Sequence, residues 1–559
     1  MKCALTILWI ILFPLATFTM DPQKILASMS IEQKIAQLII AATISNEEKN
    51  QETIQVWKEW SPDTRLDQAY AEHLIKNRHI GGVIFYGNNT SAQEQKQIIT
   101  HLQSLSPLPL FFVLDTETGL HNRLSKETVT SYPCAMALGA IQDCSLLYQL
   151  GVMLGNQLKA LGVNFACSPV CDINWAPNPI IGARSFGENK YNVAKHAIAL
   201  MQGLQKSGII ACAKHWPGHG RVDKDSHEEL PLVSSSLRYI LTHDLYPFKK
   251  LIDGGVKSVM LAHLEIPALE KQKGLPSSLS HAIATTLLKK KLGFKGIVIT
   301  DAMCMKGVTG YAKPGKRELM ALQAGADLIL CPEQPEVVIA YIAKAMHKGK
   351  ISEKEINRKG LKVLKAKAEM IGQKDQTKLS LEDLQSEEAK KLKQQLFAKS
   401  ITLAKSNKKN PFWLANGNQA VITIGDDASP FEEVVTKHAM PCHAISQTFD
   451  DQERAKLQPF IENNKHIIIS IHTMNWDQKE NYGIPARCFE LLEHLKKAGK
   501  EVTVVVFGSP YSIPQFKNAD NILVAYQNDE GAQKAAAEII CGVQQAEGKL
   551  PIQIINEEL

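Results

Sequence analysis

Between Ile80 and Cys331 the chain alternates short apolar runs, rich in β-branched residues, with longer stretches of helical character. This alternation is typical of repeated βα units around a parallel sheet, and we expect an α/β fold built on a TIM-like (β/α)8 barrel. The expected strands are residues 82–86, 110–115, 163–169, 209–214, 258–263, 297–301 and 327–331. Most of these runs end in polar residues, which is where the active sites of such barrels lie.

The length of the chain, 559 residues, exceeds what one hydrophobic core usually organises, so more than one domain is expected. We predict that the barrel spans residues 21–345 and that the Lys/Glu/Gln-rich residues 346–399 form a helical connector. Strand-like and helix-like segments then alternate again, which predicts a smaller α/β sandwich domain over residues 400–559. The expected strands of this domain are residues 420–424, 466–471, 502–507 and 522–525.

Residues 1–20 combine a short basic start with an apolar centre, the pattern of a signal peptide or an N-terminal anchor. We therefore expect an exported protein, and no integral membrane domain, because the run is short and does not recur. The 11 cysteines favour the alternative of a cytoplasmic protein that starts at Met20. Several of them, such as Cys167 and Cys212, lie in apolar runs, where buried free thiols suit a reducing compartment.

The charge balance excludes one class of partner. The 63 basic and 57 acidic residues leave a formal net charge of only +6, so we expect no nucleic-acid partner. Lysine-rich stretches such as residues 289–291 are typical of exposed helices and connections.

Titratable side chains are densest in the loop that follows the expected strand 209–214. His215 and His219 are four residues apart, but Pro217 and Gly218 lie between them and make a helix improbable. A loop can still gather histidines and aspartates around zinc, so a zinc-dependent hydrolase is one alternative. The candidate ligands for it are His215, His219, Asp225 and His227. Single loop histidines are otherwise most often structural residues.

Asp225 and His227 are separated by one residue, and in an extended segment such side chains point the same way. A carboxylate beside an imidazole fixes its tautomer and raises its basicity, which makes His227 a candidate proton donor and acceptor. Asp301 ends a buried strand at the barrel mouth and is a candidate nucleophile, although an Asp there can equally cap the next helix.

Two further segments offer charged groups of the kind that recognise hydroxyl groups. Asp115 and Arg123 frame one of them, and Arg184 lies in a loop bracketed by glycines in the other. Carboxylates and guanidinium groups recognise hydroxyls with a fixed, often bidentate geometry.

Taken together, these segments resemble glycoside hydrolase family 3, in its β-N-acetylglucosaminidase branch. The resemblance rests on Lys-His-Trp-Pro-Gly-His-Gly at residues 214–220, followed by Asp-Ser-His at residues 225–227. It implies that His227 is the acid/base, Asp225 its partner and Asp301 the nucleophile. It also implies a sugar site made by Asp115, Arg123, Arg184, Lys214 and His215. This chain has Glu-Thr-Gly-Leu at residues 117–120, where relatives commonly read Glu-Gly-Gly-Arg.

The resemblance implies a retaining exo-β-N-acetylglucosaminidase that removes terminal N-acetylglucosamine from peptidoglycan-derived glycans. The expected partner is thus a small glycan or muropeptide, and we expect no metal and no organic cofactor. A phosphorylase on the same scaffold is the nearest alternative, because a histidine acid/base does not repel an incoming phosphate as a carboxylate does. A non-catalytic glycan-binding protein is a further alternative, which the intact Asp225, His227 and Asp301 disfavour.

Overall fold

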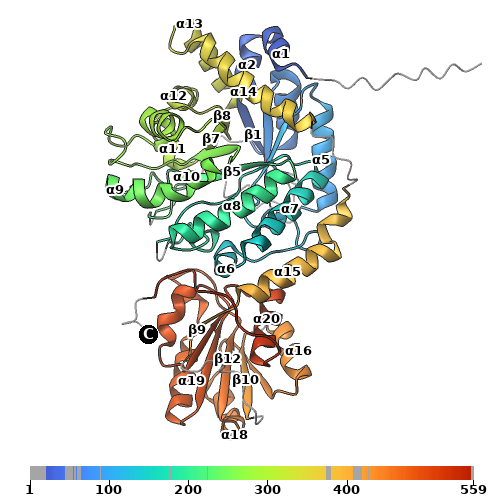
Figure 1. Ribbon diagram of the computed structural model, residues 1–559, viewed down its shortest axis with the longest axis vertical. Coiled ribbons are helices and arrows are strands. Elements are labelled where there is room, and N and C mark those ends of the chain that lie inside the picture. The colour runs from blue at the N-terminus through green and yellow to red at the C-terminus, as the bar shows by residue number, and fades with distance from the viewer. Residues whose placement is uncertain are drawn as a thin grey trace, which may run out of the picture.

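The protein, seen in a computed structural model, has two domains, a barrel and a smaller sheet domain that lies against it (Figure 1). The structure describes residues 20–44, 55, 58, 65–87, 90–175, 178–222, 224–372, 379–406, 418–425 and 427–554. The predicted export signal therefore lies outside the described residues, apart from Met20.

The first domain is a closed barrel, in which the described residues form eight parallel strands in sequential order. Its strands are β1 (Ile39–Ile44), β2 (Gly82–Tyr86), β3 (Phe111–Leu114), β4 (Phe165–Ala166), β5 (Ile210–Trp216), β6 (Ser258–Leu261), β7 (Ile297–Ala302) and β8 (Leu328–Leu330). The predicted TIM-like barrel is confirmed, and most strands lie within a few residues of their predicted positions.

The sequence analysis missed β1, which pairs with both β2 and β8 and so closes the barrel. All six residues of this strand are buried, so its sequence is a continuous apolar run without alternation. Periodicity alone does not distinguish such a run from a buried helix.

Helices surround the barrel and connect its strands (Figure 1). They are α1 (Pro22–Ser28), α2 (Ile31–Ala36), α4 (Gln68–His73), η1 (Leu74–Arg78), α5 (Ala92–Ser104), η2 (Leu120–Asn122), α6 (Ala135–Ala140), α7 (Cys144–Leu161), η3 (Gly182–Arg184), α8 (Lys190–Lys206), α9 (Leu237–Tyr239), η4 (Ile240–Asp244), α10 (Leu245–Asp253), η5 (Ser277–Leu279), η6 (Ala282–Lys291), α11 (Lys306–Thr309), α12 (Lys316–Ala324), α13 (Pro335–His347) and α14 (Glu353–Gly372).

Helix α14 lies in the segment that we expected to be a connector, and it packs against α1 and α2. It buries two lysines. Lys359 donates to the carbonyl of Ala326 over 2.6 Å, and Lys367 donates to Gln37 Oε1 over 2.8 Å. Burial lowers the pKa of Lys367 to about 7, because the apolar surroundings penalise the charged amine.

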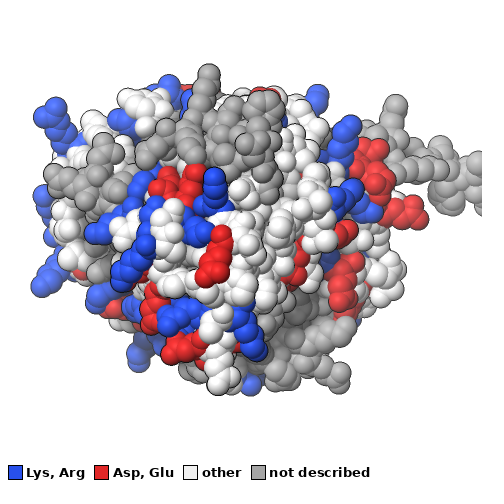
Figure 2. All heavy atoms as spheres, turned by 90° about the horizontal axis from the view of Figure 1, so that it is seen from below, with Lys and Arg blue, Asp and Glu red and all other residues white. Residues whose placement is uncertain are grey.

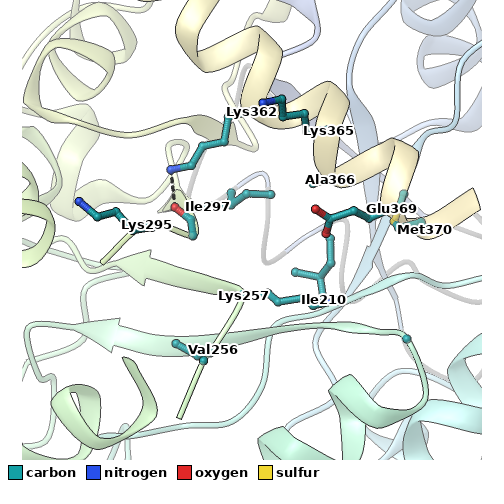
Figure 3. A pocket seen from close by; sticks show the side chains of 13 residues that line it. Ile210, Val256, Lys257, Lys295, Ile297, Lys362, Lys365, Ala366, Glu369 and Met370 are labelled. Atoms are coloured by element: carbon teal, nitrogen blue, oxygen red, sulfur yellow. Dashed lines mark hydrogen bonds between the residues drawn. The ribbon is translucent and has the colours of Figure 1, made fainter. Parts of the chain in front are cut away.

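The same helix covers a hollow of about 340 Å³ at the N-terminal ends of the strands, shown in Figure 3. Ile210 and Ile297, the first residues of β5 and β7, line it together with Lys362 and Glu369 of α14. Lys362 donates a hydrogen bond to the carbonyl of Gly296 across this hollow (Figure 3). The hollow lies at the end of the barrel opposite to the predicted site.

The second domain is a sheet in which the described residues form six strands, in the order β11-β10-β12-β13-β14-β9. They are β9 (Thr402–Lys405), β10 (Gln419–Ile424), β11 (Cys442–Ile445), β12 (His466–Ile471), β13 (Glu501–Val506) and β14 (Asn521–Val524). All neighbours are parallel except β9, which runs antiparallel to β14. The predicted sandwich is confirmed, but the edge strands β9 and β11 were not predicted from the sequence.

Alternating side chains of this sheet bury two apolar layers. Ile422 and Ile469 face the helices α18, α19 and η9, whereas Val421 and Ile468 face α15, α16 and α20. Helix η7 (Leu381–Gln385) packs against α7 of the barrel. The helices of the sheet domain are α15 (Glu387–Ser400), α16 (Ser429–Lys437), α17 (Asp451–Lys456), α18 (Gln458–Glu462), η8 (Asn481–Gly483), α19 (Ala486–Lys497), η9 (Pro510–Phe516) and α20 (Glu530–Ile540). Met136, Ala137 and Ala140 of α6 join the first layer, so the two domains share apolar packing.

The surface of the second domain mixes charges of both signs, as Figure 2 shows for the face seen from below. Arg487, for example, lies 2.6 Å from Asp451, and Arg454 lies 3.5 Å from Glu490. Among the described residues no helix has both the length and the apolar character that crossing a membrane requires. Cys167, Cys171, Cys212 and Cys331 are buried free thiols, as predicted.

Candidate active site

The polar residues predicted at the strand ends meet at the C-terminal mouth of the barrel. Asp115 directly follows β3, Lys214 and His215 belong to the last part of β5, and Asp301 belongs to β7. Lys214 Nζ lies 2.9 Å from Asp115 Oδ1, which joins two strand ends that are 99 residues apart in the chain.

A charged array occupies one side of this mouth, and Lys214 is its centre. Its Nζ lies 2.9 Å from Asp115 Oδ1 and 2.8 Å from Glu117 Oε1, and its side chain is only 3% exposed. Arg123 Nη2 donates to Asp115 Oδ2 over 2.9 Å. Arg184 forms a bidentate pair with Glu117, with distances of 2.8 Å from Nε and 2.7 Å from Nη2. Four of the predicted sugar-binding residues therefore lie in one network.

Electrostatics keep this network ionised. Burial by itself raises the pKa of Asp115 and of Glu117. At Asp115 the positive charges of Lys214 and Arg123 outweigh the effect of burial. At Glu117 the charges of Arg184 and Lys214 do the same. Both carboxyl groups thus have a pKa below the ordinary value. Because the folded-state pKa is depressed, the stabilisation that they provide is present at neutral pH and is lost as the pH falls below about 4.

His215, the fifth predicted sugar-binding residue, is oriented by Asp172, which the sequence analysis did not name as a candidate. His215 Nδ1 lies 2.7 Å from Asp172 Oδ2, and the backbone N–H of His219 donates to Oδ1 over 2.7 Å. Asp172 is fully buried; burial raises its pKa, and His215 more than offsets this, so the pKa is lowered. His215 Nε2 is thereby directed to the site, 3.4 Å from Arg184 Nη2.

The predicted contact between Asp225 and His227 is present. His227 Nδ1 lies 2.7 Å from Asp225 Oδ1, and the same oxygen accepts the backbone N–H of His227 over 2.9 Å. Both side chains are about one third exposed, at 34% and 33%. The hydrogen bond from His227 lowers the pKa of Asp225 against the opposing effect of burial. The Asp225 carboxylate thus orients the His227 imidazole, and both groups are open to solvent.

His227 of this pair is close enough to Asp301 to lower the pKa of its carboxyl group. Burial raises its pKa, but His215, His263 and then His227 bring it below the ordinary value. Asp301 Oδ1 also accepts the backbone N–H of Ala302 over 2.9 Å. An ionised carboxylate with these neighbours suits a nucleophile.

The loop that carries Asp225 and His227 rests on the beginning of α11. The carbonyl of Ser226 accepts the N–H of Gly307 over 3.0 Å, and the carbonyl of His227 accepts the N–H of Lys306 over 3.2 Å. Below the loop, His219 Nε2 lies 3.0 Å from Ser226 Oγ. A Cβ on Gly307 would lie 2.8 Å from the Ser226 carbonyl oxygen, so this close approach requires glycine.

Two of the four candidate zinc ligands, Asp225 and His227, contact each other, and the other two have partners outside this set. His215 contacts Asp172, His219 contacts Ser226, and His227 contacts Asp225. Among the described residues, no three or more His, Cys, Asp or Glu side chains are grouped closely enough to hold a metal ion.

Sequence reasoning missed Glu117 and Asp172 as site residues. Glu117 lies two residues after Asp115 in a segment already singled out, so its position was the available signal. Asp172 follows an apolar run in the same way as Asp115 and Asp301, but its partners come from a different loop.

The fold and the site together define a class of protein. It is a two-domain α/β enzyme whose active site, at the strand ends of the barrel, suits a carbohydrate substrate. Comparison with known proteins is consistent with this class. Residues 30–366 match the model of the glycosyl hydrolase family 3 N-terminal domain, and residues 398–558 match that of the C-terminal domain. The chain therefore belongs to glycosyl hydrolase family 3.

Individual relatives cover from half of the chain to most of it. It is similar to beta-hexosaminidase A of Pseudoalteromonas piscicida, with 26% identity over 86% of this chain and 90% of the relative. A beta-hexosaminidase of Chromobacterium violaceum is 34% identical over 50% of this chain and 78% of the relative. The solved structure of a family 3 beta-N-acetylglucosaminidase from Paenibacillus sp. superposes with a TM-score of 0.76 and 27% identity, covering 94% of this chain and 99% of that one.

Proposed function

We propose that this protein is an exo-acting glycoside hydrolase that removes terminal β-linked N-acetylglucosamine with retention of anomeric configuration. One observation carries the mechanism: the ionised Asp301 and the Asp225–His227 pair lie at the same barrel mouth as the charged array. The names of the family 3 relatives support the substrate class.

In the first step, the Asp301 carboxylate attacks the anomeric carbon and forms a covalent glycosyl-enzyme. The bond to the leaving oxygen breaks as protonated His227 donates its proton to that oxygen. Because Asp225 engages Nδ1, we assign the transferred proton to Nε2. Asp225 stabilises the imidazolium before transfer and holds the ring orientation throughout.

In the second step, neutral His227 accepts a proton from water while the water oxygen attacks the anomeric carbon. The bond to Asp301 breaks, the carboxylate is restored, and His227 ends protonated as it began. Two displacements at one carbon give overall retention.

The charged array recognises the sugar that undergoes this reaction. Asp115 and Glu117 offer carboxylate acceptors, and Arg123, Arg184 and Lys214 offer fixed donors, as in the bidentate recognition of hydroxyl groups. His215 adds a ring nitrogen whose orientation Asp172 fixes.

We further propose that the natural substrates are peptidoglycan-derived glycans or muropeptides. The motif at residues 214–227 supports this choice, and the export pattern at residues 1–20 is consistent with a cell-wall substrate. Release of N-acetylglucosamine from muropeptides, compared with chitooligosaccharides of equal length, tests it. A clear preference for chitooligosaccharides would contradict the cell-wall assignment.

The activity itself is tested with chromogenic β-N-acetylglucosaminide and β-glucoside, each with and without inorganic phosphate, while NMR identifies the first sugar product. We expect β-N-acetylglucosamine to appear first, at a rate independent of phosphate, with poor turnover of the glucoside. Formation of a sugar 1-phosphate would establish the phosphorylase instead. An α-anomer as the first hydrolysis product would contradict the double displacement.

Gly307→Ala is expected to lower kcat by about 10- to 100-fold. The added methyl group meets the Ser226 carbonyl and displaces the loop that carries His227, and displacements of about 1 Å have effects of this size. Gly310→Ala, near the same helix, is the matched control, because a Cβ there meets nothing within 4 Å. Steady-state kinetics of both variants check the prediction, and equal kcat values would contradict it.

A further inference from the structure

The connection between β4 and α8 carries two groups of the site. It is described over residues 167–175 and 178–189. Asp172, near its start, orients His215, and Arg184, near its end, forms the bidentate pair with Glu117. The placement of this connection therefore determines the geometry of the sugar-binding groups.

The C-terminal domain holds this connection at two points through one hydroxyl group. Tyr511 of η9 accepts a hydrogen bond from Asn174 Nδ2 over 2.6 Å and donates one to Glu188 Oε1 over 2.8 Å. Asn174 is fully buried and lies two residues after Asp172, and Glu188 lies four residues after Arg184. Burial raises the pKa of Tyr511, so the hydroxyl keeps its proton and can donate and accept at once.

The last described residues of the chain add a second attachment. Glu188 donates its backbone N–H to the carbonyl of Pro551 over 3.0 Å, and its Oε2 accepts the N–H of Gln553 over 2.8 Å. Gly187 has φ of +123°, and a Cβ there would lie 2.3 Å from the Pro551 carbonyl oxygen. The two backbones thus approach as closely as glycine allows.

A third part of the domain lies beside Arg184 itself. The loop after β12 brings Trp476 to η3, where the indole would lie 3.8 Å from a Cβ on Gly182. Two separate parts of the C-terminal domain therefore contact the connection and a third lies beside it, and none of them involves the reacting groups Asp301 and His227.

We propose that the C-terminal domain positions the sugar-binding connection in cis, and that Tyr511 is the positioning residue. This inference rests on the proposed glycosidase function of the barrel. According to this proposal, the second domain sets the affinity for the sugar through Asp172 and Arg184. Asp301 and His227 carry out the chemical step.

Tyr511→Phe removes only the bridging hydroxyl and tests the proposal. We expect KM for the chromogenic β-N-acetylglucosaminide, and the inhibition constant of free N-acetylglucosamine, to rise by about 5- to 30-fold, the range for one or two lost hydrogen bonds. The change in kcat should be under about threefold. Hydrogen exchange of the amides of residues 178–189 should become faster, whether or not substrate is present.

Tyr526→Phe is the matched control. Its hydroxyl lies 2.7 Å from Thr402 Oγ1 within the C-terminal domain, so the same chemical change there should leave KM and the exchange of residues 178–189 unchanged. A second test combines Tyr511→Phe with Arg184→Lys. Because Tyr511 acts through Arg184, the two effects on KM should be far from additive.

The outcomes separate the two proposals. Wild type without turnover of any β-N-acetylglucosaminide overturns the proposed function, whatever the exchange data show. An active wild type whose Tyr511→Phe variant has unchanged KM and unchanged exchange over residues 178–189 overturns the positioning role. Additive effects in the double variant would overturn the part of the proposal in which Tyr511 acts through Arg184.

Discussion

Replacing Asp301 by alanine should lower kcat/KM for a chromogenic β-N-acetylglucosaminide by roughly 10⁴- to 10⁶-fold, the scale seen when a nucleophile is removed. Asp301 is ionised in the folded protein, because His215, His263 and His227 together outweigh the effect of burial on its pKa. Alanine cannot form the glycosyl-enzyme, and no other described carboxylate occupies the end of β7. Steady-state kinetics measure the loss.

Asp253→Ala is the control for this variant. Asp253 ends α10 at the surface, where it forms an exposed ion pair of 3.0 Å with Lys249, so its removal should leave kcat/KM unchanged. A 5-fluoro glycosyl substrate should label wild type on the peptide that contains Asp301, as read by mass spectrometry. Labelling of another peptide, or substantial turnover by Asp301→Ala, would overturn the nucleophile assignment.

The strand-end residues could be predicted because buried strands have a strong sequence signal. The runs before Asp115, Lys214 and Asp301 are apolar and β-branched, and each ends abruptly in a charged residue. In a parallel barrel this pattern fixes both the sheet and the face where the residues meet. Asp225 and His227 could be paired because only one residue separates them.

The remaining parts of the site could not be predicted, because they depend on contacts between distant loops. Asp172 matters only because His215, 43 residues later, turns its Nδ1 towards it. Tyr511 is 323 residues away from Glu188, and nothing in the local sequence of η9 points to the barrel. The strand β1 was missed for a different reason, since its unbroken apolar run lacks the alternation that identifies a strand.

The two domains also depend on each other more than their separate sheets suggest. Met136 and Ala140 of the barrel's α6 complete an apolar layer of the second domain, and Lys549 donates its backbone N–H to the Ala140 carbonyl over 2.9 Å. Because this shared packing lies beside the connection that carries Arg184, a change in the second domain can reach the sugar site without touching it.

Lys214→Met is expected to destabilise the protein by about 3–5 kcal/mol at neutral pH, the cost of removing one partner from a buried ion pair. The variant leaves Asp115 and Glu117 without the amine that lies within 3 Å of both. Arg123 and Arg184 remain, but each contacts only one of the two carboxylates. The same change removes a central donor of the sugar site, so KM should rise by at least about tenfold.

The dependence on pH distinguishes this cause from a general loss of packing. In wild type the pKa of both carboxyl groups is depressed, so the stabilisation is present above about pH 4. Without Lys214 the buried carboxyl groups protonate more readily, and the variant loses less stability on acidification than wild type does. The difference in free energy of unfolding between wild type and Lys214→Met should therefore be larger at pH 7 than at pH 4.5, as denaturant titrations at both values would show.

Lys365→Met, on the exposed side of α14, makes the same chemical change at the surface and should alter stability by less than about 0.5 kcal/mol. An equal loss at both pH values for Lys214→Met would mean that packing, and not the pairing of Lys214 with the two carboxylates, holds this side of the site together.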